Sequence, residues 1–150
     1  MGVVFGANRL EELVLRVSDV ELDKSDLERL SALVSDKLHD MLIVGVRHAG
    51  YNNRDLIMEA DLPITKGLQE SMQDFELYEE AFEVEPILEQ LATYPLMDRE
   101  PSQEVIDMLP DLLGTLIMVT TQLMTVVDPG VENPGTETWE RVTKTMDLLV

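Results

Sequence analysis

Carboxylates are the side chains of this sequence most able to do chemistry, because 30 of its 150 residues are aspartate or glutamate. Close pairs such as Glu11-Glu12, Glu79-Glu80 and Asp23 with Asp26 have the ligand type that binds divalent cations and the group that transfers protons in hydrolysis. A composition this acidic produces such pairs without selection for a site, so we expect most of them to be solvated surface charges. A small carboxylate-based metal protein or hydrolase is therefore only a second alternative function.

The other groups typical of enzymes are sparse. His39 and His48 lie nine residues apart on one expected helix, so they do not share a face as a ligand pair spaced by four would, and surface or capping roles are expected. The sequence has no cysteine, which excludes disulfides, thiolate metal sites and thiol nucleophiles. It also lacks a glycine-rich phosphate loop and a nucleophile elbow. We predict that the protein is not an enzyme and has no catalytic residue, metal site or cofactor.

The charge of the chain argues against nucleic acid as its partner. Eleven basic residues against 30 acidic ones give a formal net charge of -19, which opposes binding to phosphates. The hydrophobic share of 45% is enough for a core, so the acidity indicates a solvated surface and not disorder. The start of the chain, Met1-Gly2-Val3-Val4-Phe5, has neither a basic flank nor a long apolar run, and with the missing cysteines this favours the cytoplasm. The uncharged stretch 112–127 is shorter than the ~20 residues of a membrane span, so it predicts a buried core helix.

The spacing of apolar residues predicts an all-α protein, since no segment alternates apolar and polar residues as a half-buried strand does. The first half should hold a short helix over residues 8–18, a long helix of about 25 residues ending near Gly50, and a third helix over residues 61–75. A short extended piece is expected around Leu56-Ile57.

Local residue types mark where these helices should begin and end. Ser25 and Glu28 have the spacing of a capping box at the start of the long helix, and Gly50 supplies its stop. Pro63 is tolerated in the first turn of the third helix.

The second half of the chain repeats this order with different residues. A short helix is expected over residues 86–93, then a long helix opened by Pro101 with Pro110 inside it, and a final helix capped by Thr136. Two apolar stripes support the last two helices: Val105, Leu109, Leu112, Leu116, Val119, Leu123 and Val127, and then Trp139, Val142, Met146 and Leu149.

Several residues at the end of the first long helix resemble those of archaeal histones. Arg47-His48-Ala49-Gly50 is similar to the Arg-His-Ala-Gly that closes the long histone helix. Arg54 and Asp61 keep the histone spacing between a loop arginine and the aspartate that begins the last helix, despite a three-residue insertion, Tyr51-Asn52-Asn53. The resemblance implies an ion pair between Arg54 and Asp61 that fixes the loop to the helix.

The segment 51–75, with Arg54-Asp55-Leu56-Ile57 and Asp61-Leu62-Pro63-Ile64, is similar to an uncharacterised prokaryotic family of single-chain double-histone-fold proteins related to archaeal histones. This resemblance implies two tandem histone folds that pack as an intramolecular handshake, or pseudodimer. Residues 1–78 would form the first fold, 79–85 an acidic connector and 86–150 a second, divergent fold, all within one compact unit, 1–150. The alternative is another bundle of six or seven helices.

The resemblance weakens where archaeal histones hold DNA. Asp55 and Leu56 stand where those histones have a lysine and a threonine, and Asp19-Val20-Glu21 stands where an arginine is expected. The leading hypothesis is therefore a cytoplasmic, non-catalytic interaction protein that binds a protein partner, with a basic partner favoured by the charge. It would bind no membrane and would be a monomer, with the pseudodimer built in, or a weak homo-oligomer. The alternative is a histone-like nucleoid protein that uses a local basic face, with these candidate contacts: Arg9, Arg16, Lys24, Arg29 and Arg54.

Overall fold

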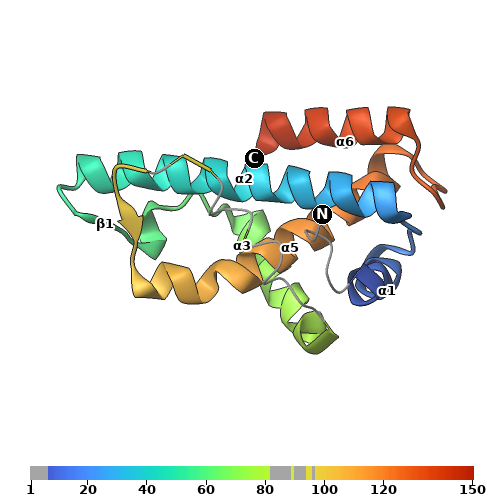
Figure 1. Cartoon of the computed structure of the whole chain (residues 1–150), viewed down its shortest axis with the longest axis horizontal. Coiled ribbons are helices and arrows are strands. Elements are labelled where there is room, and N and C mark those ends of the chain that lie inside the picture. The colour runs from blue at the N-terminus through green and yellow to red at the C-terminus, as the bar shows by residue number, and fades with distance from the viewer. Residues whose placement is uncertain (1–6, 82–88, 90–93, 96) are drawn as a thin grey trace.

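The computed structural model describes residues 7–81, 89, 94–95 and 97–150 (Figure 1). The first half contains α1 (Ala7–Ser18), α2 (Lys24–Tyr51), the strand β1 (Leu56–Ile57), the 3-10 turn η2 (Glu59–Asp61), α3 (Lys66–Phe75) and the 3-10 helix η3 (Glu76–Ala81). The second half contains the strand β2 (Glu100–Pro101), α5 (Gln103–Val127) and α6 (Thr136–Leu149). The chain is mostly helical, as predicted. The helix expected over residues 86–93 falls on residues that, apart from Glu89, lie outside the described part.

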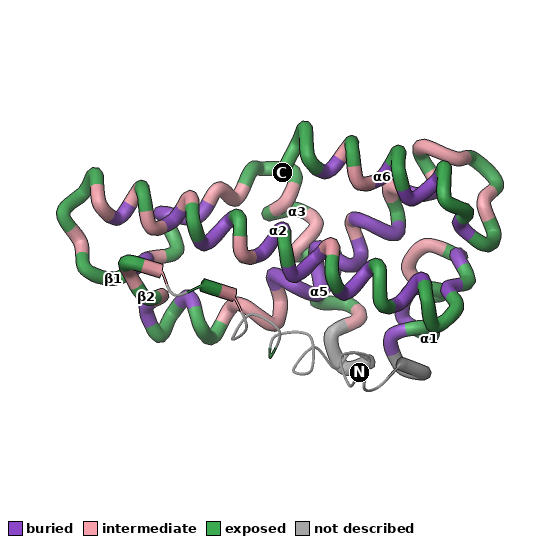
Figure 2. The backbone as a smooth tube through the Cα atoms, turned by 45° about the horizontal axis from the view of Figure 1, so that its top comes forward, coloured by how far each residue is buried: buried purple, intermediate pink, exposed green. Residues whose placement is uncertain are grey.

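Helix α5 lies at the centre of the structure, because α1, α2, α3 and α6 all pack against it (Figure 1). Most side chains from Leu112 to Thr121 are buried against these neighbours, and Leu112, Leu116 and Ile117 are fully buried. Figure 2 shows buried residues concentrated where α2 and α5 face each other. Among the described residues α5 is the one helix long and apolar enough to cross a membrane, and 56% of its most apolar window is buried by the other helices. This burial supports the prediction of a core helix.

Threonines are tolerated inside this core helix because their hydroxyls bond to the helix itself. Thr115, Thr120 and Thr121 are buried, and each donates to the carbonyl four residues earlier, at 2.7, 2.6 and 3.1 Å. A buried hydroxyl without a partner would destabilise the fold, whereas these side chains present only their methyl groups to the core.

Loops pair at both ends of the two long helices. At one end β1, which follows α2, runs parallel to β2, which precedes α5, with Ile57 opposite Pro101. At the other end the amide of Glu21, ahead of α2, donates to the carbonyl of Glu132, after α5, at 2.8 Å. The loop before each long helix is thus bonded to the loop after the other one, and the arrangement has a two-fold pattern.

The start of α2 differs from the predicted capping box. Asp23 is the N-cap, its carboxylate accepts from the amide of Asp26 at 2.8 Å, and Asp26 accepts in return from the amide of Asp23 at 3.1 Å. Ser25 and Glu28 are already helical and exposed. The prediction was wrong by two residues because an aspartate pair at the same spacing caps a helix as well as Ser with Glu does.

Gly50 does not end α2, which continues through Tyr51. Asn52 is the C-cap, and Asn53 takes the left-handed conformation, with φ of 56°. Gly50 instead leaves room for the side chain of Arg99, because a Cβ at residue 50 would lie 3.2 Å from the Nη1 atom of Arg99. The inserted Tyr51-Asn52-Asn53 therefore lengthens the helix by one residue and supplies its cap.

Two other helix starts also differ from the prediction: α3 begins later than expected, and α6 begins one residue earlier. The segment expected to be helical from Asp61 onward is extended at Leu62, as is usual before a proline, and α3 begins only after Thr65, whose hydroxyl accepts from the amide of Leu68 at 3.1 Å. In α6 the N-cap is Gly135, and Thr136 is the first helical residue. Leu149, expected on the apolar stripe of this helix, is exposed.

A second, smaller core forms where α3 passes onto η3. The Phe75 ring is buried with Leu13 and Met118, and the tip of the ring reaches the backbone of α5 because Gly114 has no side chain there. A Cβ at Gly114 would be 2.2 Å from the Cζ atom of Phe75.

We predict that Gly114→Ala lowers the free energy of unfolding by about 1–3 kcal/mol, because the ring or the helix must move to make room. Gly67→Ala is the matched control: it lies in α3, where a Cβ meets only the Thr65 hydroxyl at 4.0 Å, and it should be neutral or stabilising by up to about 1 kcal/mol. Urea unfolding followed by circular dichroism measures both. Equal stability of the two variants would show that Phe75 does not rest on Gly114.

A fragment of residues 1–80 should not fold as a monomer. Without α5 it would expose the buried stripe of α2, which holds Leu27, Leu30, Val34, Leu38 and Met41. Circular dichroism with sedimentation equilibrium checks this. A cooperative, monomeric fragment would mean that the two halves of the chain are independent bundles.

Candidate functional site

Arg54 and Asp61 meet at the end of α2. The Nη2 atom of Arg54 donates to Asp61 Oδ1, and Asp61 Oδ2 accepts from the amide of Met58 at 2.8 Å. The Asp61 side chain is only 2% exposed, while that of Arg54 is 39% exposed. His48 Nδ1 donates to the backbone carbonyl of Asp61 at 2.9 Å. These bonds join α2, the loop after it and η2.

Arg99 brings the second half of the chain to the same place. Its Nε atom donates to the backbone carbonyl of Arg54 at 2.8 Å, and its guanidinium covers Gly50. Arg54 Nε is buried and has no hydrogen-bond partner. Arg47 is exposed on the last turns of α2. Three arginines from two parts of the sequence therefore gather at the β1–β2 end of an otherwise acidic protein, although the exposed Asp55 and Glu100 lie among them.

The other candidate nucleic-acid contacts are not brought to this place. Arg16 is exposed on α1, and Lys24 and Arg29 are exposed in the first turns of α2, whereas Arg54 follows its last turn. The 28 residues of α2 at ~1.5 Å each separate these ends by about 40 Å. The side chain of Arg9 lies outside the described part. The five residues singled out from the sequence therefore do not form one basic face.

An open groove of about 600 Å³ lies between α2 and α6. Leu33, Ala32 and Trp139 supply its apolar part. The charged and polar residues along it come from both helices: Arg29 and Asp36 from α2, and Thr136, Glu140, Thr143, Lys144 and Asp147 from α6. The sequence does not predict this groove, because the α6 stripe containing Trp139 indicates a buried face but not which helix packs against it.

Two polar contacts fix the walls of the groove. The indole Nε1 of Trp139 donates to Asp26 Oδ1 at 2.9 Å, and Lys37 Nζ donates to Asp147 Oδ1. Asp26 and Lys37 are both buried. Because a buried charge without its partner is costly, these two contacts hold α6 in register on α2.

His39, on this part of α2, makes a contact that the sequence did not predict. Its ring stacks on Tyr94 with centroids 4.5 Å apart, and the Tyr94 hydroxyl donates to Asp36. Burial and the bond to Asp36 both raise the pKa of Tyr94 above its usual value. His39 is half-buried and so does not have the expected surface role, whereas His48 has a capping-type contact.

In the described part of the chain, no three side chains of histidine, aspartate or glutamate converge as metal ligands would. The acidic pair Asp23 and Asp26 caps a helix, and Glu11 and Glu12 are exposed on α1. The side chains of Glu79 and Glu80 lie outside the described part. The arrangement of the described residues offers surfaces and a groove for binding.

The chain is similar to proteins whose names state no activity. The model of a family described as "Domain of unknown function (DUF1931)" matches residues 10–147. An uncharacterized protein from Aquifex aeolicus (strain VF5) is 25% identical over 144 residues, which cover 96% of this chain and 84% of that protein. Another from the same organism is 28% identical over 116 residues, or 70% of each chain.

Two crystal structures share the fold. A protein from Thermus thermophilus has a TM-score of 0.89 and 40% identity, covering 95% of this chain and 97% of that chain. A protein from Aquifex aeolicus has a TM-score of 0.80 and 24% identity, covering 97% and 95%. The second similarity shows the fold alone.

We expect Arg54→Ala to lower the free energy of unfolding by about 1–4 kcal/mol, the range between a partly exposed and a buried ion pair. It would leave the buried Asp61 carboxylate with only the Met58 amide. Urea unfolding of Arg54→Ala, Asp61→Ala and the double variant gives the coupling energy. A coupling energy near zero would show that the contact does not stabilise the fold and that Arg54 is free to bind a partner.

Proposed function

The chain belongs to the DUF1931 family, and on that premise we propose that it is a non-catalytic interaction protein built from two histone folds in one chain. The loop contacts at both ends of α2 and α5 carry this proposal. If two equivalent helical units are related by a two-fold axis and their long helices cross, the start of each long helix must lie near the end of the other. The bonds between β1 and β2, and between Glu21 and Glu132, have this relation.

Two further observations support the proposal. The long helices have similar lengths, 28 and 25 residues, and each is followed by a shorter helix. The resemblance to archaeal histones implies an ion pair between Arg54 and Asp61, and these two side chains are in contact, although Asp61 lies in η2 and α3 begins only at Lys66.

The surface charge suggests how such a protein selects partners. A net charge of -19 attracts basic proteins at long range and repels nucleic acid and other acidic proteins. We therefore propose a basic protein partner. The absence of cysteine is consistent with a reducing compartment, so we propose that the protein acts in the cytoplasm.

DNA binding is a second candidate function, and one specific observation favours it. Arg47, Arg54 and Arg99 lie at the β1–β2 end, where Arg99 Nε donates to the carbonyl of Arg54. Phosphate contacts provide most non-specific affinity for DNA, and three arginines offer few of them within so acidic a surface. The charge makes this function secondary to protein binding.

We predict that random duplex DNA binds more weakly than ~100 µM at physiological salt, below the usual non-specific range. A basic peptide should bind more tightly than a neutral peptide of the same length, with an affinity that falls as salt is added. Fluorescence anisotropy with labelled DNA and peptides measures these affinities.

Arg54→Glu and Lys24→Glu test which basic residues contact DNA, because they reverse the charge at opposite ends of α2. Micromolar affinity for DNA with a steep salt dependence, lost in either variant, would make the nucleoid function the leading one. Equal binding of the basic and neutral peptides would contradict the proposed choice of partner.

A further inference from the structure

One face of α2 is left bare in the described structure. Helix α6 covers the N-terminal half of α2, and beyond the end of α6 no other described helix lies over α2 (Figure 1). The described residues that lie against the C-terminal half from the segment before β2 include Tyr94, which stacks on His39, and Arg99, which lies against Gly50. Ile43, Arg47 and Tyr51 follow one another there at intervals of four residues, so they share one side of the helix. Ile43 is 47% exposed, Tyr51 is 75% exposed and Arg47 is exposed. We call these three residues the α2 face.

The α2 face is locally basic in an acidic protein. From Met41 to Arg54 the sequence has no aspartate or glutamate, and it has Arg47, His48 and Arg54. Arg47 makes no ion pair with any described residue, whereas Arg54 is paired with Asp61. The face therefore combines an unpaired cation with an aliphatic and an aromatic side chain, and its charge fits an acidic partner.

The same chain carries a surface of complementary chemistry. Residues 67–98 include nine acidic and no basic residues. Within the described part of this segment, Glu70, Asp74 and Glu76 are exposed along α3 and the start of η3, and Lys66, just before the segment, lies 3.4 Å from Glu70 Oε1. Leu77 beside them is 81% exposed, more than any other large apolar side chain of the described structure. We call these four residues the α3–η3 arm.

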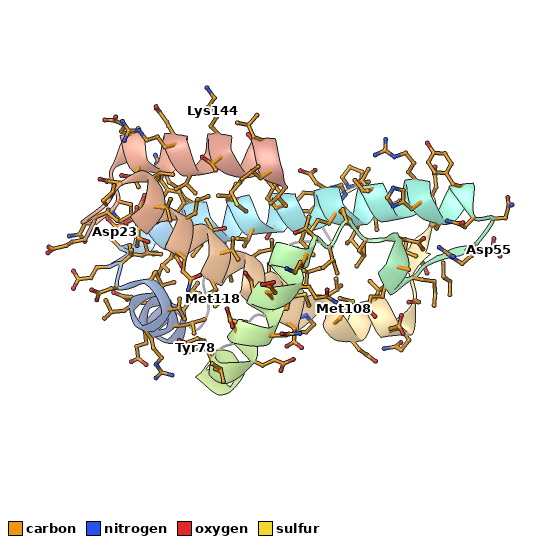
Figure 3. All side chains as sticks on the ribbon, turned by 180° about the vertical axis from the view of Figure 1, so that it is seen from behind. Asp23, Asp55, Tyr78, Met108, Met118 and Lys144 are labelled. Atoms are coloured by element: carbon orange, nitrogen blue, oxygen red, sulfur yellow. The ribbon has the colours of Figure 1, made fainter. Side chains whose placement is uncertain are left out.

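The two surfaces cannot meet within one molecule. Helix α3 runs away from α2, so that its end and Tyr78 after it lie on the far side of the molecule (Figure 3). We propose that the α2 face of one copy of this chain binds the α3–η3 arm of a second copy, with Arg47 against the carboxylates and Leu77 between Ile43 and Tyr51. This inference does not depend on the proposed histone folds or on the basic protein partner.

The charges favour this unlike pairing over a like one. Two α2 faces in contact would place Arg47 against Arg47, and two arms would place carboxylates against carboxylates. When the α2 face of one copy binds the arm of another, the pair still has one unoccupied α2 face and one unoccupied arm. Further copies can bind to these, so the copies would form chains or rings. The net charge of -19 opposes association at long range, but at physiological salt charges more than ~8 Å apart are largely screened while direct contacts persist. The association should therefore be weak and depend on protein concentration.

Cross-linking tests the pairing directly, because the natural chain has no cysteine. Asn52→Cys lies beside the α2 face and Gln73→Cys beside the arm, and both positions are exposed and neutral. When the two variants are mixed and oxidised, the dimer linking residue 52 to residue 73 should exceed either homodimer about tenfold. Val126→Cys, at an exposed position of α5, should cross-link with each at random. A mixed dimer at its random share would overturn the proposal.

Sedimentation velocity over rising concentrations of the intact chain gives an independent test. Arg47→Glu should raise the dissociation constant of self-association about tenfold or more, the effect of about 1.4 kcal/mol at a contact. Lys24→Glu makes the same change of net charge at the exposed start of α2. It should change the dissociation constant less than about twofold. A wild-type chain that stays monomeric at millimolar concentration, or equal effects of the two variants, would refute the pairing. Duplex DNA that binds the wild type but not Arg47→Glu, without self-association, would assign the α2 face to nucleic acid instead.

Discussion

The need to bury most of the surface of α5 determines most of this structure. This helix has no charged residue between Asp111 and Asp128, so water must be kept from most of its circumference, and no single neighbour is wide enough to do that. Four helices share the task, three of them from the first half of the chain and one from the second, with α2 crossing it near the middle. We therefore expect that the first half does not fold as an independent domain to which the second is added. It provides the surroundings in which α5 becomes a core helix.

Burial alone does not determine how these helices are placed relative to one another. Hydrogen bonds to two buried carboxylates determine it further. Asp26, at the start of α2, caps its own helix and accepts a hydrogen bond from the Trp139 indole. This bond fixes the position of α6 on α2. Asp61, beyond the end of α2, receives Arg54 and the Met58 amide and, through its carbonyl, His48. Each carboxylate has at least two donors, which offsets the cost of removing it from water. Small residues complete the placement where backbones must approach, as Gly114 does under the Phe75 ring.

The sequence predicted the helices well and their ends less well. Apolar periodicity is a property of a whole helix, so the long helices over residues 24–51 and 103–127 were identified despite Pro110. A helix end depends on one or two hydrogen bonds, and several residues of this polar chain can make them: Asp23 replaced the expected Ser25, and Asn53 took the turn expected of Gly50. Gly50 could not have been interpreted correctly from sequence, because its reason is Arg99, 49 residues later. The groove between α2 and α6 could not be predicted either, because it depends on residues far apart in the sequence. The apolar stripe of α6 does not indicate which helix it packs against.

The two surfaces of α2 show how an acidic protein can remain selective. Where α6 covers the helix, the groove has charges of both signs around Trp139, and Asp147 on its wall neutralises the buried Lys37. Where α6 ends, the helix presents Arg47 without an ion pair among the described residues, and the nearest acidic residues in sequence are Asp40 and Asp55. Long-range attraction depends on the total charge, whereas the fit of a bound partner depends on charges within a few ångströms. A basic protein drawn in by the whole molecule would thus be repelled locally at the α2 face, so a basic partner and an acidic one need not compete for the same surface.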